Sequence, residues 1–589
     1  MAKATGKAVD ISLLRRVLQY TKPYKKILFY SVALTIALAA LAPLRPLLIE
    51  HTLDTYIIEN DSTGLLSIVI LMIGLLILQV LMGYFHTYCS NTLGQSVIRD
   101  LRTDTFDHIT SLRLKYFDRT PIGQLITRTV SDLETIAAIF SEGLIVLIGD
   151  LLQVFVIMGV MLYTDWELTL IVLIPMPFLI LASIVFKEAI KSAFQEVRTQ
   201  VSHLNTFLQE HIIGISLIQY FAREKQEMDK FKQINAQHRD ANIRSNWYYS
   251  IFFPVVEIIS AISMGLLVWY GSKLILSNQT SPGVIVAFLM YINMLFRPIR
   301  ELADKFNTLQ MGMVGAERIF NVLDTHELTE NHGTHHPKLL HGDILFEHAW
   351  FAYHDQNWVL KDISFHIKPG ETLALVGATG AGKSSIINIL NRFYEINKGS
   401  IQIDGLDIRE YRLEYLRSKI TTVLQDTFLF SDSIANNITL NNPQITREQL
   451  IATAKEVGAH DFIERLPGGY DYNVMERGAT LSIGQAQLIS FIRALVYDPK
   501  ILVLDEATSS IDTETEELIQ NVLHKLMQKR TSIIIAHRLS TIQNADKIIV
   551  LDHGEIKEMG SHQELLKLNK YYKRLYDLQF NSDGIAKTV

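Results

Sequence analysis

One short stretch carries residues whose types and spacing suit the binding of phosphate. The run Gly377-Ala-Thr-Gly-Ala-Gly-Lys-Ser384 matches the pattern Gly-x4-Gly-Lys-Ser/Thr. Glycines in such a loop let the backbone curl until its N–H groups surround a diphosphate. Lys383 would then reach the outer phosphates, and the Ser384 hydroxyl would bind Mg²⁺. The run therefore predicts a site for a nucleotide with magnesium.

The segments on either side of this run fit that interpretation. Residues 372–376 form an apolar run that predicts a short buried strand, and residues 385–393 predict a helix. The N-terminal end of a helix offers positive dipole charge and free N–H groups, both of which favour an anion. The order of strand, loop and helix is the context that the motif requires.

Two further strands end in polar residues that suit the same chemistry. Ile501-Leu-Val-Leu504 is followed by Asp505 and Glu506. An aspartate at such a strand end can hold Mg²⁺ through water, and the adjacent glutamate can polarise an attacking water. The strand expected at residues 533–536 ends at His537, which either contacts a γ-phosphate or is an ordinary loop residue. Spacing alone does not decide between the two.

Length and composition indicate two parts. The chain has 589 residues, of which 48% are hydrophobic, with the surplus concentrated before residue 300. A net charge of −6 gives no sign of a nucleic-acid partner. The single cysteine, Cys89, excludes an internal disulfide and suits a buried small side chain.

The first part contains six apolar runs of the length that spans a membrane, which takes about 20 residues for a helix. The runs lie near residues 27–49, 64–86, 138–163, 166–186, 248–271 and 282–296. The sixth run is short and ends in Arg297-Pro298. We expect an α-helical membrane domain of six transmembrane helices with long cytoplasmic extensions.

The charges of the loops predict the orientation of these spans. Residues 1–26 carry seven Lys or Arg, residues 87–135 carry six and residues 187–247 carry nine. The alternate loops carry one at most, at Lys273. Positive charge stays in the cytoplasm, so both termini and the two long loops are predicted to be cytoplasmic.

Apolar side chains within these basic segments indicate helices. In the longer loop they recur every three or four residues, at Leu204, Leu208, Ile212, Ile215 and Ile218. This spacing predicts that the membrane helices continue into the loop and dock on another surface. Near the N-terminus, Leu13, Leu14, Val17, Leu18 and Tyr20 alternate with basic residues and predict a short helix at the membrane surface.

Three polar residues lie inside the predicted spans. Arg45 stands between Pro43 and Pro46, which predict a broken helix. Asp150 and Glu257 are carboxylates at membrane depth, where an ionisable group is costly. Each either faces the path of a transported substrate or makes a structural contact within the helix bundle.

Composition also sets the domain boundaries. Residues 326–341 are polar and contain five histidines. Metal binding is one interpretation, and a disordered linker is the preferred one because no acidic or cysteine ligands follow a fixed spacing. We expect a membrane domain at 1–325, a linker at 326–341, an α/β nucleotide-binding domain at 342–580 and a tail at 581–589.

The segment Leu481-Ser-Ile-Gly-Gln485, taken with Tyr353, Gln425 and the motifs above, resembles the ABC transporters. The resemblance is to the exporter type, in which six spans precede one P-loop ATPase cassette, and it covers nearly the whole chain. Two positions depart from the family pattern Leu-Ser-Gly-Gly-Gln-Arg-Gln. Ile483 replaces its first glycine, and Ala486 replaces its arginine.

The resemblance implies a complete ATP site. Tyr353 would stack on adenine, Ser384, Gln425 and Asp505 would hold Mg²⁺, and Glu506 and His537 would be catalytic. The implied nucleotide-binding residues are Tyr353, Gly377, Ala378, Thr379, Gly380, Ala381, Gly382, Lys383, Ser384, Ser385, Gln425, Leu481, Ser482, Gly484, Gln485, Asp505 and Asp512. Residues 476–478 resemble the exporter loop that touches the membrane helices. Residues 117–128 and 209–218 resemble the coupling elements.

The resemblance also implies what the protein does. We expect one half of a dimeric exporter that uses ATP to move an amphipathic substrate, such as a drug or lipid, across a bacterial inner membrane. A lipid flippase, a peptide exporter and an ATP-gated channel are the alternatives. A heterodimer is favoured over a homodimer, because only a heterodimer confines the loss of glycine at Ile483 to one of the two ATP sites.

Overall fold

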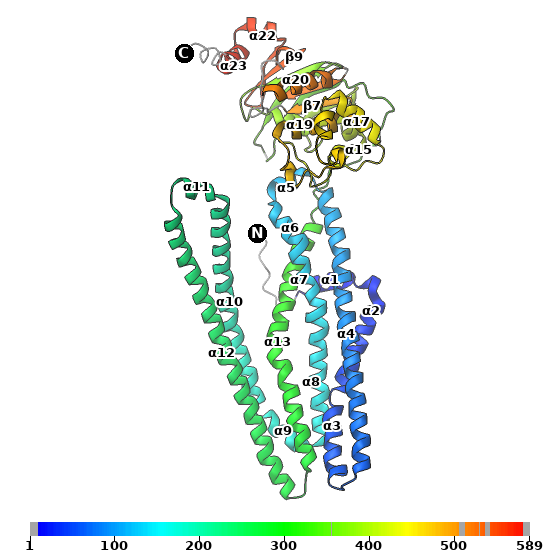
Figure 1. The fold of residues 1–589 in the computed structure, drawn as a ribbon, viewed down its shortest axis with the longest axis vertical. Helices are drawn as coiled ribbons and strands as arrows, with labels where there is room; N and C mark the ends of the chain where they lie inside the picture. The colour runs from blue at the N-terminus through cyan, green and yellow to red at the C-terminus, as the bar shows by residue number, and fades with distance from the viewer. Residues whose placement is uncertain (1–9, 355, 506–512, 529, 536–541, 581–589) are drawn as a thin grey trace. The chain divides into compact units, whose positions relative to one another are not determined.

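The computed structural model describes residues 10–354, 356–505, 513–528, 530–535 and 542–580 (Figure 1). The chain divides into two compact units. The first comprises residues 1–110 and 121–326, and the second comprises residues 111–120 and 327–589. The short segment 111–120 therefore belongs to the nucleotide-binding unit, although it lies within the membrane half of the sequence.

Helices build the first unit. They are α1 (Ile11–Gln19), α2 (Lys25–Leu41), α3 (Leu44–His51), α4 (Ser62–Ser111), α6 (Ile122–Thr127), α7 (Leu133–Ala138), α8 (Leu144–Thr164), α9 (Trp166–Leu173), α10 (Met176–Ile213), α11 (Ile215–Tyr220), α12 (Glu224–Leu276) and α13 (Pro282–Leu323).

Five helical stretches of the described chain are long and apolar enough to cross a membrane. They are Lys22–Ile57, Ser62–Ser111, Ile122–Thr164, Trp166–Phe186 and Glu224–Leu276. They contain the first five predicted runs, which confirms these as helical.

The sixth run lies in α13, where the apolar stretch Pro282–Pro298 is shorter than the other five. Pro298 is inside this helix, which continues to Leu323. The apolar stretch ends at Pro298, as the sequence indicates, whereas the helix itself runs on beyond it. A proline removes one backbone hydrogen bond, and the rest of this long helix tolerates the loss.

The first membrane stretch is broken, as its prolines predict. α2 ends at Leu41 and α3 begins at Leu44, with Pro43 at the N-cap position between them. A proline fixes its own backbone angle and lacks an N–H, so it fits the start of a helix better than the interior. Arg45 lies on α3 directly after this break and is exposed within the chain.

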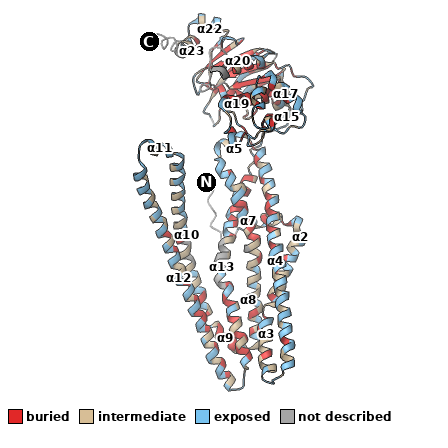
Figure 2. Cartoon of the chain, in the orientation of Figure 1, coloured by how far each residue is buried: buried red, intermediate tan, exposed pale blue. Residues whose placement is uncertain are grey.

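The long basic loop continues the membrane helices, which confirms the prediction from its apolar spacing. α10 has 38 residues and α12 has 53, and α11 joins them at their shared end (Figure 1). Figure 2 shows that the outer parts of this helical pair are mostly exposed. Around α11, Ile213 is 76% exposed and Tyr220 is 85% exposed. Apolar side chains this accessible are typical of a docking surface.

The N-terminal helix α1 packs on the end of α13. Val17 is fully buried, and both Arg16 nitrogens Nη1 and Nη2 donate to the Asp324 carboxylate at 2.7 and 2.8 Å. The Arg16 guanidinium also lies 4.1 Å from the centre of the Phe320 ring. The apolar face of α1, which was predicted to lie on a membrane surface, is therefore packed in part against the helices of this unit.

At the other end of α13, the first membrane stretch closes over the start of the helix. The Asp54 carboxylate accepts a hydrogen bond from the Ser281 hydroxyl and another, at 2.9 Å, from the Gly283 N–H. These contacts satisfy N-terminal groups that a helix leaves unpaired. A Cβ on Gly283 would lie 2.6 Å from the Glu50 carbonyl oxygen, so glycine allows this close approach.

Two sheets form the centre of the second unit. The strands are β1 (Ile344–Phe351), β2 (Leu360–Ile367), β3 (Thr372–Val376), β4 (Lys398–Ile403), β5 (Leu406–Asp407), β6 (Ile420–Val423), β7 (Ile501–Asp505), β8 (Thr531–Ile535), β9 (Lys547–Asp552) and β10 (Glu555–Gly560). One sheet is antiparallel with the order β2-β1-β4-β5, and the other has the order β10-β9-β3-β8-β7-β6.

The predicted strands at residues 372–376, 501–504 and 533–536 are β3, β7 and β8 of the six-stranded sheet. β6, β7, β8 and β3 are paired side by side in parallel, and β9 continues this parallel arrangement beyond β3. The carboxyl ends of these strands therefore meet at one edge of the sheet. Ligands of open parallel sheets bind outside this edge.

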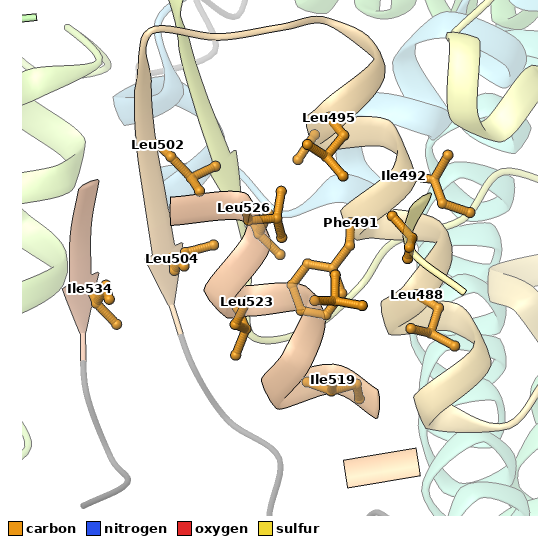
Figure 3. Close-up of a cluster of buried hydrophobic side chains, with 14 of the residues drawn as sticks. Leu488, Phe491, Ile492, Leu495, Leu502, Leu504, Ile519, Leu523, Leu526 and Ile534 are labelled. Atoms are coloured by element: carbon orange, nitrogen blue, oxygen red, sulfur yellow. The ribbon is translucent and has the colours of Figure 1, made fainter. Parts of the chain in front are cut away.

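Helices surround the two sheets. They are α5 (Leu114–Arg119), α14 (Lys383–Leu390), α15 (Leu413–Lys419), α16 (Ile434–Thr439), α17 (Arg447–Glu456), α18 (His460–Glu464), α19 (Ile483–Val496), α20 (Thr513–Met527), α22 (His562–Leu568) and α23 (Tyr571–Phe580). Figure 3 shows how α19 and α20 pack on β7 and β8 through a cluster of buried apolar side chains. The fold class predicted from the sequence, helical membrane domain followed by α/β cassette, is confirmed.

Residues 327–341 of the predicted linker belong to the second unit, and two of them pair with residues 410–414. The His335 N–H donates to the Glu410 carbonyl at 3.1 Å, and the Arg412 N–H donates to the His335 carbonyl at 3.0 Å. The Asn331 side chain binds Glu414 and the Leu413 N–H. Backbone pairing of this kind leaves no compositional trace. Within the described chain, no group of three or more His, Cys, Asp or Glu side chains is placed to hold a metal.

The cluster in Figure 3 predicts the cost of removing its largest side chain. Phe491 is 2% exposed, so Phe491→Ala should destabilise the cassette by about 3–5 kcal/mol. Thermal unfolding of the full-length protein should show an apparent Tm lower by about 10 °C, since each kcal/mol shifts the midpoint of a domain of this size by a few degrees. The control Leu568→Ala, at a position 51% exposed, should leave Tm nearly unchanged. An equal effect of the two variants would contradict the packing described.

Candidate nucleotide-binding site

The phosphate loop lies between β3 and α14, as predicted. β3 is buried along its whole length. Gly380 and Gly382 have φ angles of 84° and 106°, a region that residues with a Cβ rarely adopt. A Cβ on Gly377 would lie 2.2 Å from the Leu551 carbonyl oxygen. The backbone of this loop therefore requires glycine at three positions of the motif.

Lys383 begins α14 and folds its side chain back over the loop. Its Nζ donates to the carbonyl oxygens of Gly377 and Ala378, at 2.7 and 3.0 Å. The residue is 8% exposed. Burial lowers the pKa of its ammonium group, and the negative charge of Asp505 acts in the opposite direction. A buried cation beside the start of a helix fits a phosphate, which would receive charge-assisted hydrogen bonds there.

Tyr353 stands beside the phosphate loop and is held at both ends. Its hydroxyl lies 3.0 Å from the Ser385 Oγ and accepts a hydrogen bond from the Asn388 Nδ2 at 3.3 Å. Its ring packs edge-on against Phe351 and Tyr394, with ring centres 4.7 and 4.9 Å apart. The contact with Ser385 places an aromatic ring next to the helix that would bind the phosphates. An aromatic ring in this position can stack on a base.

The three predicted magnesium ligands follow neighbouring elements at the same sheet edge. Asp505 is the last residue of β7, Gln425 lies two residues after β6, and Ser384 is exposed in the first turn of α14. A carboxylate, an amide oxygen and a hydroxyl are the oxygen donors that Mg²⁺ prefers. The donor set therefore fits Mg²⁺. The remaining loop residues of the prediction, Thr379 and Ala381, lie within the phosphate loop itself.

The signature residues lie on a separate element, the N-terminal end of α19. Ser482 and Gln485 form a capping box, in which the Gln485 N–H donates to the Ser482 Oγ and the Ser482 N–H donates to the Gln485 Oε1. Gly484 is buried, and Leu481 packs against the apolar core. The start of this helix is intact, so its N–H groups remain able to bind an anion.

Ile483 occupies this helix start without backbone strain. It is the first residue of α19, and its φ angle is not positive. Its side chain is 64% exposed. Isoleucine therefore meets no left-handed backbone strain at this position. It places a β-branched side chain at the surface where the helix would approach a nucleotide.

Three predicted residues, Glu506, Asp512 and His537, lie outside the described residues. Their neighbours Asp505 and Ile535 are the last residues of β7 and β8. The described chain therefore contains the phosphate loop, Tyr353, Gln425 and Asp505 of the predicted site and, on a separate element, the signature at the start of α19.

Residues 476–478, predicted to be the exporter loop, pack against the segment that follows Gln425. A Cβ on Gly478 would lie 2.8 Å from the side chain of Leu429, which is fully buried. Arg493 of α19 donates to the carbonyl oxygens of Phe428 and Asn437, and burial lowers the pKa of its guanidinium. These contacts tie the signature helix, the exporter loop and the segment after β6 together. The sequence motifs gave no sign of Arg493, because one arginine inside an apolar helix has no distinctive spacing.

The two carboxylates of the predicted substrate path have different surroundings. Asp150 forms an ion pair with Lys305, which also lies 2.9 Å from the Glu301 carboxylate. Glu257 is exposed on α12. Lys305 lies on α13 beyond the apolar stretch that ends at Pro298, so the apolar pattern gave no sign of it. An ion pair within the bundle favours the structural alternative for Asp150 over the path.

Comparison with known proteins agrees with this arrangement. A family model described as the ABC transporter transmembrane region matches residues 28–299, and one described as ABC transporter matches residues 360–509. The Bacillus subtilis protein named uncharacterized ABC transporter ATP-binding protein YknV is 39% identical over 570 residues, covering 96% of this chain and 94% of its own.

Two further relatives have names that state an activity. The probable multidrug resistance ABC transporter ATP-binding/permease protein YheH of Bacillus subtilis is 38% identical, covering 88% of this chain and 78% of its own. The ATP-dependent lipid A-core flippase of Desulfotalea psychrophila is 34% identical, covering 96% of this chain and 99% of its own. With one membrane region fused to one ATP-binding region, the chain belongs to the ABC transporter family as a half-transporter.

Proposed function

We propose that this chain is one half of a dimeric exporter that hydrolyses ATP to move a small amphipathic molecule, a drug or a lipid, across a membrane. The observation that carries the proposal is the sheet edge shared by the phosphate loop, Gln425 and Asp505. Because membrane-crossing helices belong to the same chain, ATP chemistry at this edge can drive movement of those helices.

Each residue of the edge has a proposed task. Tyr353 stacks on the adenine, and the loop N–H groups with Lys383 hold the phosphates. Ser384, Gln425 and Asp505 hold Mg²⁺, which neutralises charge on the phosphates when bound. Glu506 accepts a proton from the attacking water, and His537 contacts the γ-phosphate.

The site is completed by a second half-transporter. The signature of one chain lies across the ATP from the phosphate loop of the other, and Asp512 belongs to this interface. ATP shifts the pair toward the closed state only to the extent that it binds that state more tightly. Hydrolysis removes this preference, and the membrane helices return to their first arrangement.

Names of relatives support the class of substrate. One relative carries a multidrug resistance name and another a lipid A-core flippase name. Bacterial relatives and basic loops on one side support an inner-membrane location with both termini in the cytoplasm. A lipid flippase is the second candidate, favoured by the flippase relative. A flux measurement with a fluorescent phospholipid against a cationic dye separates the two.

The catalytic proposal predicts the behaviour of Glu506→Gln. An amide cannot accept the proton, so turnover at this chain's own site should fall by about 10²–10³-fold or more. ATP binding should remain, because the phosphate loop and Tyr353 are unchanged. ATPase activity and ATP binding are measured on the same preparation, with Glu456→Gln, at an exposed glutamate of α17, as the matched control. Normal hydrolysis with bound ATP would remove Glu506 from the mechanism.

The substrate-path proposal predicts a selective effect of Glu257→Gln. Loss of one negative charge should reduce export of a cationic dye more than export of a neutral lipid probe, with smaller change in basal ATPase activity. Glu59→Gln, outside the apolar stretches, serves as the control.

Asp150→Asn should instead lower thermal stability, since it leaves the half-buried Lys305 without the nearer of its two carboxylate partners. Unchanged dye selectivity in Glu257→Gln would make that residue structural too.

The partner proposal predicts that this chain works poorly with itself. In a homodimer, Ile483 would stand opposite both nucleotides, whereas a heterodimer confines it to one. The chain expressed alone should show little ATPase activity, and Ile483→Gly should raise it about tenfold, equivalent to about 1.4 kcal/mol at the transition state. Leu568→Ile, which changes an exposed apolar residue on α22, is the control. Robust activity from a single-species dimer, unaltered by Ile483→Gly, would establish a homodimer.

A further inference from the structure

We propose that the corner between α1 and α2 is a binding surface for an anionic phospholipid, whose headgroup phosphate contacts Lys22, Lys25 and Lys26. The lipid at this surface is a bound component of the membrane and not the transported molecule. The inference goes beyond the proposed function, since it depends only on the membrane-crossing stretches of the chain. Three features of the first unit carry it: the level of the lysines along the helices, the exposed aromatic side chains beside them and the exposed face of α1.

Two hydrogen bonds fix the level of α2 against α4 near this corner. The Ser31 and Ser90 hydroxyl oxygens lie 2.7 Å apart, and the Tyr24 hydroxyl donates to the Asp100 carboxylate at 2.6 Å. The three lysines fall within residues 22–26, about 8–14 Å from the serine pair along the helix at 1.5 Å per residue. No charged residue follows them within α2. The lysines therefore mark the end of the apolar part of this helix.

Exposed aromatic side chains lie close to the level of the two serines. They are Phe29 and Tyr30 on α2 and Tyr88 on α4. Tyrosine is enriched at the depth where the apolar layer of a membrane meets its headgroups. A lysine placed a turn or two beyond this depth reaches the lipid phosphates, because its long side chain extends toward the headgroups.

The charges of the three lysines are not neutralised by carboxylates. All three side chains are exposed, and none forms an ion pair among the residues that the structure describes. The ion pairs nearby belong to other basic residues, namely Arg16 with Asp324 and Arg99 with Asp100. Clustered positive charge next to a membrane-crossing helix attracts anionic headgroups.

The exposed face of α1 extends this surface. Figure 1 shows α1 lying across the direction of α4, which is long and apolar enough to cross a membrane. Val17 faces the core of the unit, whereas Ile11 and Arg15 are exposed. These two residues are four apart and so share one face of the helix. An apolar and a basic residue on the outer face are typical of a helix that lies on an anionic membrane surface.

Native mass spectrometry of the full-length protein in mild detergent, without nucleotide, tests the proposal. Dioleoyl phosphatidylglycerol and dioleoyl phosphatidylcholine share their acyl chains and differ in headgroup charge. The parent should bind phosphatidylglycerol at least about tenfold more tightly than phosphatidylcholine. Lys22→Gln/Lys25→Gln/Lys26→Gln should weaken phosphatidylglycerol binding by about tenfold or more, and leave phosphatidylcholine binding within about twofold of the parent. Lysines that are merely solvated would give no such difference.

Two sets of variants control for charge and folding. Lys368→Gln/Lys567→Gln/Lys570→Gln removes the same charge from exposed positions of the nucleotide-binding unit and should keep the lipid preference. Replacing the three corner lysines with arginine keeps the charge and should keep the preference as well. If the triple glutamine variant does not fold, Lys26→Gln alone decides, with an expected loss of about fivefold.

Unchanged phosphatidylglycerol binding in the corner variants, or an equal loss in the control on the nucleotide-binding unit, would overturn the inference. Displacement of the lipid by a large excess of soluble glycerol phosphate would also overturn it, since the surface would then bind free phosphate. All of these measurements are made without ATP. Their failure would leave the proposed exporter in place, and a parent without ATPase activity would leave the lipid surface in place.

Discussion

Parallel pairing of β6, β7, β8 and β3 sets four strand ends side by side, and most of the proposed ATP chemistry follows one of these ends. β3 leads into the phosphate loop, β6 precedes Gln425, and β7 ends at Asp505. Parallel strands must be joined by crossover segments, so these residues are far apart in sequence and meet only in the sheet. The strands themselves are almost completely buried, which fixes the edge as a rigid platform.

The signature residues lie at the start of a helix and not at the end of a strand. They occupy the start of α19, a helix that packs on the sheet through the cluster in Figure 3. Arg493 lies on the same helix and holds the segment after Gln425. A nucleotide at the edge and a partner at the signature, as proposed, would therefore act on one connected set of elements. Coupling of this kind needs elements whose equilibrium both sites bias.

The motifs predicted the fold and the nucleotide site because each has a local cause. Gly380 and Gly382 have φ angles that other residues avoid. The strand that ends at Asp505 is recognisable because its buried residues form an uninterrupted apolar run. The pairing of His335 with residues 410 and 412 had no such sign, since it is made by backbone bonds available to any sequence. Lys305 had no such sign either, since its partner Asp150 lies more than a hundred residues away.

The contact between Asp54 and Gly283 restricts how the membrane unit can rearrange. The backbones approach so closely that a methyl group on Gly283 would overlap the Glu50 carbonyl. Separating the first stretch from α13 at this end would remove the carboxylate from two donors at once. We therefore expect the first membrane stretch and the start of α13 to move together. A passage that opened at this end and kept these contacts would form between other helices of the unit.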